Sequence, residues 1–364
     1  MSTLLKRIFL FATCLLSATV ALAQEDNRPN PIMIQKQGSF MVGGTVVENP
    51  GTFSYSDFWN PAGQGAYGDH VYAFYQVPVD AKPLPIVFLH GGGQTGKTWE
   101  TTPDGREGFQ NIFLRRKYTC YLVDQPRRGR AGATSQPTTV GPSFTNKMLY
   151  ALFRIGHYPD FYPGVQFPQD PECVEQLLRC ATPDTGPYDD YVTAEGMAAL
   201  FNNKTGPSIL VTHSRGGHPG WLTALKSENV KAIVSFEPGG WKYVFPFPEG
   251  EVPEPIQSAY GLHQGEPIPL EEFEKLTRIP IIIYYGDFIA EQPVEHIGED
   301  QWRAEMQMAR TFADAINRHG GDAQVVHLPE IGIKGNTHFL MSDLNNVEIA
   351  NLMEKWLTEK GLSR

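Results

Sequence analysis

Cysteine is scarce in this sequence, with four among 364 residues. Cys14 lies in an apolar run near the start, and Cys120 lies in a second apolar run that predicts a buried thiol. The chain therefore offers one candidate disulfide, between Cys173 and Cys180. A continuous helix over residues 172–180 would separate these two cysteines by about 10.5 Å, too far for a bridge. The disulfide and the helix are alternatives that the sequence leaves open.

Long apolar runs, metal-ligand motifs and an excess of positive charge are also lacking. Beyond residue 23, no stretch approaches the roughly 18 uninterrupted apolar residues that a membrane-spanning helix needs. The sequence has neither an H-E-x-x-H motif nor a Cys/His ligand cluster, so no metal site is predicted. These absences favour a soluble protein without a membrane span.

The first 23 residues have the pattern of a secretory signal peptide. Lys6 and Arg7 precede an apolar run over residues 8–23, which ends in the small-residue pattern Ala21-Leu22-Ala23. We predict cleavage after Ala23 and therefore a secreted or periplasmic protein. Without Lys6 and Arg7, the 30 basic residues fall to 28 against 40 acidic ones. The resulting net charge of −12 argues against nucleic acid as a partner.

The sequence does contain a regular alternation of short apolar runs and amphipathic helical stretches. This alternation predicts a mostly parallel, doubly wound α/β sheet. Its central strands are predicted at residues 86–89, 119–123, 209–211, 232–236, 279–285 and 324–328. Short β-rich runs between residues 38 and 79 predict antiparallel strands that open the sheet. We predict a single domain over residues 24–364, with proline- and aromatic-rich cap insertions at about 135–190 and 241–272.

The stretch from Pro207 to Gly217 predicts a strand that ends in a sharp turn and leads directly into a helix. Such a turn would place Ser214 on a strained corner, with its hydroxyl above the sheet edge. The N–H of Arg215 would then lie at a helix N-terminus, where an oxyanion is stabilised. The usual G-x-S-x-G pattern has a glycine two residues before the serine, whereas this chain has Thr212. The plainer alternative is a strand-to-helix turn with a capping serine.

Further polar residues follow the other predicted strands, and ligands bind at the carboxyl ends of parallel strands. A serine nucleophile needs a base, a carboxylate that orients the base, and N–H donors for the oxyanion. The sequence supplies these groups in chain order: a glycine-rich loop at 90–93, Ser214, an acid and a histidine. His338 is the candidate base, because it follows the last strand in a Gly-Asn-Thr-His loop just before the final helix. We expect His213 to point away from the serine and His327, inside a strand, to be structural.

Five motifs in this order resemble the successive landmarks of α/β-hydrolase serine esterases, across about residues 85–357: His90-Gly-Gly-Gly, Asp124-Gln-Pro-Arg-Arg-Gly, Thr-His-Ser214-Arg-Gly-Gly, Ile-Tyr-Tyr-Gly-Asp287 and Gly-Asn-Thr-His338-Phe. The resemblance implies an eight-stranded sheet and hydrolysis of a small-molecule or polymeric ester through an acyl-enzyme, without a cofactor. It also implies an oxyanion hole formed by backbone N–H groups of Arg215 and of Gly92 or Gly93.

The acid has two candidates. Glu237 follows the strand at 232–236, and the rigid Pro238-Gly239 turn after it can aim one side chain. Asp287 follows Gly286 directly at the end of the next strand. We favour Glu237, which also resembles a less common branch of secreted bacterial esterases with a glutamate after strand six. Asp287 remains the alternative acid.

Two other functions compete with hydrolysis. Gly91 and the Gly96-Lys97-Thr98 sequence match the Walker A pattern of P-loop NTPases, and Asp124 resembles a Walker B aspartate. A P-loop needs a helix at its Gly-Lys-Thr, however, and the residues from Thr101 to Gly105 interrupt any helix there. The second alternative is a non-catalytic binding protein on the same fold, because a fold does not fix a function.

Overall fold

The computed structural model describes residues 30–141, 144–247 and 250–363. The chain divides into two units, Met1–Met33 and Ile34–Arg364, and every element described below lies in the second unit. The predicted signal peptide, residues 1–23, lies outside the described residues and stays a prediction.

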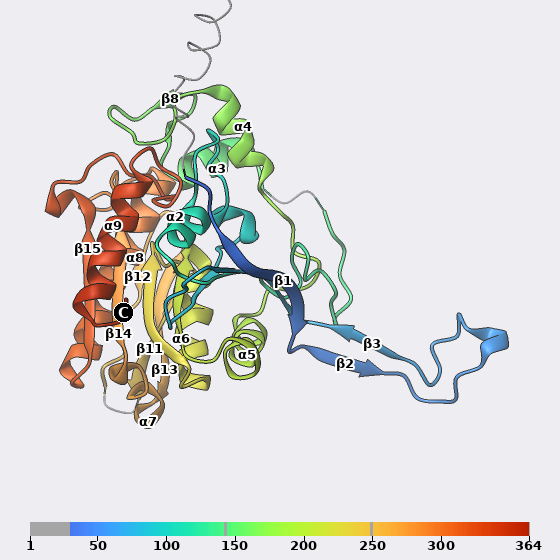
Figure 1. The fold of residues 1–364 in the computed structure, drawn as a ribbon. Coiled ribbons are helices and arrows are strands. Elements are labelled where there is room, and N and C mark those ends of the chain that lie inside the picture. Colours follow the sequence, from blue (N-terminus) through green and yellow to red (C-terminus); the bar gives the residue numbers. More distant parts are fainter. Residues whose placement is uncertain (1–29, 142–143, 248–249, 364) are drawn as a thin grey trace, which may run out of the picture. The chain divides into compact units, whose positions relative to one another are not determined.

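The central feature of the second unit is an eight-stranded sheet, with the strand order β1-β4-β6-β5-β9-β10-β14-β15 (Figure 1). β4 runs antiparallel to both of its neighbours, and the strands from β6 to β15 are parallel to one another. The predicted doubly wound α/β sheet is therefore confirmed. The strands are β1 (Ile34–Val42), β4 (Val71–Pro78), β5 (Ile86–Leu89), β6 (Cys120–Asp124), β9 (Ser208–His213), β10 (Val230–Phe236), β14 (Pro280–Tyr285) and β15 (Asp322–His327).

The inner strands are largely apolar and buried because helices cover the sheet. Every residue of β5 and β9 is buried, as expected for parallel strands enclosed on both faces. α5 packs on α6, and α2 packs on α9. The covering helices are α2 (Phe109–Arg115), α5 (Asp190–Leu200), α6 (Gly217–Lys226), α8 (Ile297–Arg318) and α9 (Asn346–Glu359). Short 3-10 or π turns are η1 (Tyr55–Asp57), η2 (Gly96–Trp99), η3 (Phe201–Thr205), η4 (Ser214–Gly216), η5 (Leu276–Arg278) and η6 (Leu328–Ile331).

The predicted cap insertions contain secondary structure of their own, although their boundaries stay predictions. The first includes α3 (Asn146–Leu152), the β7–β8 hairpin (Gly156–His157 and Asp160–Phe161) and α4 (Pro171–Arg179). The second includes a three-stranded sheet of β11 (Lys242–Phe247), β13 (Leu262–Pro269) and β12 (Ile256–Gln257), followed by α7 (Leu270–Phe273). α4 is continuous up to Arg179, and Cys173 and Cys180 are free thiols. The helix was therefore the correct alternative to the disulfide.

One expectation for the start of the chain was wrong. Residues 44–47 do not open the central sheet: β2 (Thr45–Glu48) pairs instead with β3 (Gly65–Gly68) in a separate two-stranded ribbon. Gly43 and Gly44 precede β2 with φ of 71° and 91°, a left-handed conformation that ends β1 and redirects the chain. Figure 1 shows this blue ribbon extending away from β1. Within the described residues, no helix is long and apolar enough to cross a membrane.

Candidate active site

Ser214 lies on the sharp turn that the sequence predicts. β9 ends at His213, η4 spans Ser214–Gly216, and α6 begins at Gly217. The φ of Ser214 is 53°, in the left-handed region that residues other than glycine seldom adopt. Strain of this kind persists where the surrounding structure enforces it, and it is common at functional sites. A Cβ at position 216 would lie 2.6 Å from the carbonyl oxygen of His90, so only glycine fits after the serine.

Thr212, where the chain departs from the G-x-S-x-G pattern, is accommodated by a glycine elsewhere. The Thr212 side chain is buried, and its Oγ1 lies 2.7 Å from Ser235 Oγ in a hydrogen bond between neighbouring strands. A Cβ at Gly220 of α6 would lie 2.7 Å from Thr212 Cγ2. Gly220 of α6 thus provides the room that lets the helix approach the strand at Thr212.

The glycine loop after β5 packs against the Ser214 turn. A Cβ at Gly91 would lie 2.6 Å from Ser214 Cβ, and a Cβ at Gly92 would lie 3.2 Å from Arg215 Cδ. Gly93 has a φ of 70°. Because the loop has no side chains at these positions, its backbone approaches the serine more closely than any other sequence would allow.

His338 and Glu237 come from two different loops and meet at the same site. Glu237 follows β10, and His338 lies between η6 and α9. His338 Nδ1 lies 2.6 Å from Glu237 Oε2, so the imidazole N–H donates to the carboxylate. Glu237 follows β10 with a φ of 45°, which makes it a second strained residue in this site. Its other oxygen, Oε1, accepts a hydrogen bond of 2.6 Å from the N–H of Gly286. Both side chains are buried.

Arg154, which the sequence analysis did not select, completes the surroundings of Glu237. This fully buried arginine from the first cap insertion donates through its guanidinium to Glu237 Oε1. Its Nε also donates to the carbonyl oxygen of Asp287 at 2.7 Å. Burial alone would raise the pKa of Glu237, but the charge of Arg154 and the hydrogen bond from His338 hold that pKa below its ordinary value. The sequence signal for Arg154 was weak, since it is one basic residue at the end of a short helical patch.

Asp287 does not reach His338. Its Oδ1 accepts from the N–H of Phe288 at 2.7 Å, and its Oδ2 accepts from the N–H of Gly335 at 2.8 Å. The carboxylate therefore holds a turn and the start of the loop that carries His338. The structure brings Glu237, and not Asp287, into contact with the histidine.

Aromatic rings fix the plane of the His338 imidazole. Trp302 of α8 stacks on it at a centroid distance of 4.1 Å, and Phe153 lies 5.5 Å away at an interplanar angle of 19°. Burial lowers the pKa of His338, and the neighbouring Glu237 only partly opposes this. His213 Nε2 lies 2.9 Å from the carbonyl oxygen of His338, so His213 braces the loop.

Comparison with known proteins places these features in a family. Residues 86–356 match the model of the alpha/beta hydrolase family. The chain belongs to the alpha/beta hydrolase family. It is similar to a solved structure described as a novel bacterial esterase, with 30% identity, a TM-score of 0.72, and coverage of 91% of this chain and 98% of that one. It is also 27% identical over 332 residues to a probable secreted lipase of a fungal species (strain ATCC 74256), covering 80% of this chain and 86% of the relative.

A pocket in this α/β hydrolase opens at the carboxyl ends of the strands and is lined by both Ser214 and His338. Its wall is largely aromatic and aliphatic and comes from both cap insertions: Phe144, Leu149, Leu152, Phe153, Trp241 and Tyr260, together with Trp302 of α8. The guanidinium of Arg215 lies 3.4 Å from the ring centroid of Tyr188, which orients this side chain at the pocket.

The Walker-like segment of the hydrolase lacks the geometry of a P-loop. Gly96–Trp99 forms one 3-10 turn, and the next α-helix begins only at Phe109. Lys97 Nζ donates to the carbonyl oxygen of Thr101 at 2.6 Å, which directs it away from any phosphate cradle. Asp124 accepts from the N–H of Gly96 at 2.7 Å and forms an ion pair with Arg130. These residues form a structural turn.

Proposed function

We propose that this α/β hydrolase is a secreted or periplasmic serine carboxylesterase that cleaves its substrate through an acyl-enzyme. The observation that carries the proposal is the 2.6 Å hydrogen bond between His338 and Glu237, at the base of a pocket that Ser214 also lines. A serine on a strained turn, a histidine and a buried carboxylate form the set of groups that nucleophilic acyl transfer needs.

The orientation of His338 determines the proposed proton transfers. Because Nδ1 donates to Glu237, Nε2 is the nitrogen left to accept the proton of the Ser214 hydroxyl. The serine Oγ attacks the ester carbonyl carbon, and the carbonyl oxygen becomes an oxyanion. His338 then gives its proton to the leaving alcohol, and the acyl group stays on Ser214. A water molecule then attacks the carbonyl carbon of the acyl-enzyme, and His338 accepts its proton. His338 returns this proton to the Ser214 oxygen as the ester bond to the enzyme breaks, so the carboxylic acid is released and the serine hydroxyl is restored.

The oxyanion is stabilised by backbone N–H groups. Arg215 donates from the start of the η4–α6 segment, and the glycine loop supplies the second donor from Gly92 or Gly93. Burial lowers the pKa of His338, so the imidazole is neutral near pH 7 and can act as a base. No cofactor takes part in these steps.

The comparisons support the ester substrate and the location. One similar structure is described as an esterase, and one relative is named a probable secreted lipase. The apolar, aromatic wall of the pocket suits a hydrophobic acyl or alcohol group. The signal-peptide pattern of residues 1–23 agrees with export.

The test is the variant Ser214→Ala, assayed on a panel of p-nitrophenyl and lipid esters and with a fluorescent phosphonate that labels activated serines. We expect wild-type hydrolysis and labelling, and a loss of about 10⁶ in kcat with no labelling in the variant. Ser227→Ala is the matched control, because Ser227 bonds to Asn202 away from the pocket. Full activity in Ser214→Ala refutes the mechanism. A wild-type protein that binds esters without cleaving them supports the non-catalytic alternative, and Mg²⁺-dependent ATP binding supports the P-loop alternative.

A further inference from the structure

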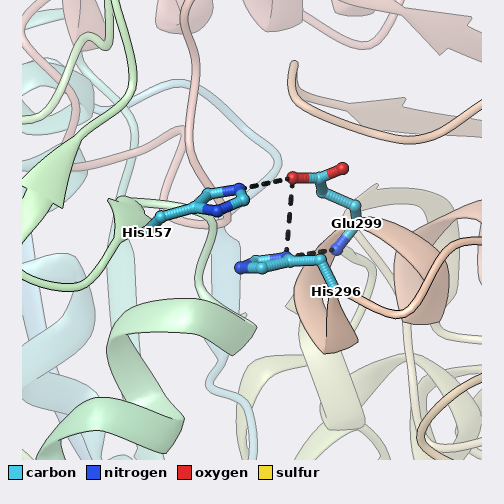
Figure 2. A group of neighbouring side chains, drawn as sticks. All are labelled: His157, His296 and Glu299. Atoms are coloured by element: carbon cyan, nitrogen blue, oxygen red, sulfur yellow. Dashed lines mark hydrogen bonds and ion pairs between the residues drawn. The ribbon is translucent and has the colours of Figure 1, made fainter.

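Two histidines and a glutamate meet outside the catalytic centre, between the first cap insertion and α8 (Figure 2). His157 ends β7 in the cap, His296 is the N-cap residue of α8, and Glu299 lies in the first turn of that helix. One potential ligand atom from each residue lies within 4.8 Å of the other two. The catalytic proposal uses none of these side chains.

The distances from the glutamate oxygen to the two imidazole nitrogens are close to those of a metal site. Zn²⁺ bonds to nitrogen and oxygen ligands at about 2.0–2.1 Å, so neighbouring ligands of a tetrahedral ion lie about 3.3 Å apart. Glu299 Oε1 lies 3.0 Å from His157 Nε2 and 3.6 Å from His296 Nδ1. The carboxylate oxygen thus lies at nearly the required distance from both imidazoles.

We propose that His157, His296 and Glu299 bind one divalent transition-metal ion of the Zn²⁺ type. Two imidazoles and one carboxylate are ligands that Zn²⁺, Ni²⁺ and Cu²⁺ accept, whereas Mg²⁺ and Ca²⁺ prefer oxygen ligands alone. Three protein ligands leave the remaining coordination position of the ion to water.

A second layer of contacts already orients the glutamate. The hydroxyl of Tyr162 donates to Glu299 Oε1 at 2.6 Å, and the Tyr162 ring stacks on Phe288 at a centroid distance of 4.3 Å. Hydrogen bonds of this kind hold metal ligands in place in known sites. They also keep the carboxylate near both imidazoles before an ion arrives.

Binding requires one local movement. The His157 and His296 rings are stacked at 4.4 Å with an interplanar angle of 14°, so one ring must tilt to direct its nitrogen at a shared ion. His157 can do this because its side chain is 62% exposed. His296 also accepts a long hydrogen bond of 3.4 Å from the N–H of Glu299, which an ion at the same nitrogen would replace.

The ion would join the cap to the helix that supports the catalytic histidine. His157 lies three residues after Arg154, which contacts Glu237, and α8 carries Trp302, which stacks on His338. The present link between these segments includes the 2.8 Å hydrogen bond from Trp302 Nε1 to the carbonyl oxygen of Leu152. A metal ion would add a second link, so the folded state would be stabilised by mass action. No sequence motif indicates the site, because 142 residues separate His157 from Glu299.

The test is titration of the purified chain with ZnCl₂ after treatment with EDTA and desalting. We expect one ion per chain with micromolar affinity by calorimetry, and a rise of at least roughly 5 °C in the unfolding midpoint at about 100-fold excess over Kd. MgCl₂ should produce neither effect. His157→Ala, His296→Asn and Glu299→Gln should each weaken Zn²⁺ binding at least ten-fold. Asn at position 296 keeps an N-cap acceptor, so this variant separates metal binding from helix capping.

His319→Gln is the matched control, because His319 forms a single histidine–carboxylate pair with Glu251 at 2.7 Å. This variant should bind Zn²⁺ as the wild-type chain does. The proposal is overturned by the absence of binding tighter than about 100 µM, or by a His157→Ala variant with unchanged affinity. Either result would mean that the three residues form a hydrogen-bonded cluster only. Since calorimetry and unfolding need no substrate, the outcome does not depend on the proposed esterase activity.

Discussion

Two neighbouring strands, β10 and β14, are each followed by a carboxylate, and the two carboxylates have different surroundings. Glu237 after β10 contacts His338, Arg154 and the N–H of Gly286. The carboxylate of Asp287 after β14 instead accepts hydrogen bonds from the backbone N–H groups of Phe288 and Gly335. A carboxylate at a strand end is thus insufficient to identify a triad acid, because its side-chain partners determine the role.

Gly286, directly after β14, leaves room for the Glu237 carboxylate. A Cβ at Gly286 would lie 2.7 Å from the carbonyl oxygen of Asn336 and 2.9 Å from Glu237 Oε1. Glycine therefore allows both the carboxylate and the His338 loop to approach β14. Asp287 then binds the same loop from its other side, through the N–H of Gly335. Glu237 after β10 therefore contacts His338 itself, whereas Asp287 after β14 positions the loop that carries His338.

Among the three substitutions that test this comparison of strand ends, Glu237→Gln should have the largest effect. The glutamine keeps the shape of the side chain but removes the negative charge that orients His338 and stabilises its imidazolium. We expect a fall of about 10⁴ in kcat with the fold retained, measured by initial rates and by thermal unfolding of the same samples. Near-normal turnover in this variant, together with a crippled Asp287→Asn, would reverse the assignment of the two carboxylates.

Arg154→Met should have an intermediate effect and a characteristic pH dependence. The proposed base works when His338 is neutral, so kcat/KM rises with pH through the pKa of His338. The charge of Arg154 helps to lower that pKa, after burial, and the charge of Glu237 raises it. Removing Arg154 should therefore move the acid limb of the profile to higher pH. Removing the charge of Glu237 should move the limb of the residual activity to lower pH.

The opposite directions of these two shifts distinguish electrostatic roles from general loss of structure. Arg154→Met also leaves the buried Glu237 without its cation, which costs about 3–5 kcal/mol of stability. Arg154→Lys is the control, because it keeps the positive charge while losing the planar fork. We expect Arg154→Lys to restore the acid limb to near its wild-type position. An unchanged limb in Arg154→Met would show that the arginine acts only in packing.

The sequence was sufficient for the sheet and for the order of the site motifs. Strands such as residues 86–89 are apolar throughout because they are buried on both faces, and this pattern is local and easily recognised. The chain order of the glycine loop, Ser214, Glu237 and His338 is likewise a property of sequence alone. Whether Glu237 or Asp287 contacts His338 depended on backbone conformation, notably the φ of 45° at Glu237, which spacing does not encode.

Contacts between distant segments could not be predicted. Arg154 reaches Glu237 across 83 residues, and Trp302 reaches His338 from α8. The Gly220 that compensates for Thr212 lies in α6 and has no motif of its own. Each of these contacts depends on how the cap and helices pack against the sheet, which is a tertiary property.

The smallest of the three effects is expected for Asp287→Asn. Asp287 accepts one backbone N–H on each oxygen, whereas asparagine offers one acceptor and places an N–H₂ group against the second donor. The loss should cost about 1–3 kcal/mol of stability, because a backbone N–H at Phe288 or Gly335 loses its acceptor. The loop that begins at Gly335 would be held less firmly, yet the direct contact between His338 and Glu237 would remain. We therefore expect a lower unfolding midpoint and a less than roughly ten-fold loss of kcat, with the acid limb of the pH profile unmoved, since the charge removed does not contact His338. A shift of the acid limb of the pH profile in Asp287→Asn would show that Asp287 acts on His338 electrostatically. Glu237 and Asp287 would then differ only in the size of their effect on the histidine.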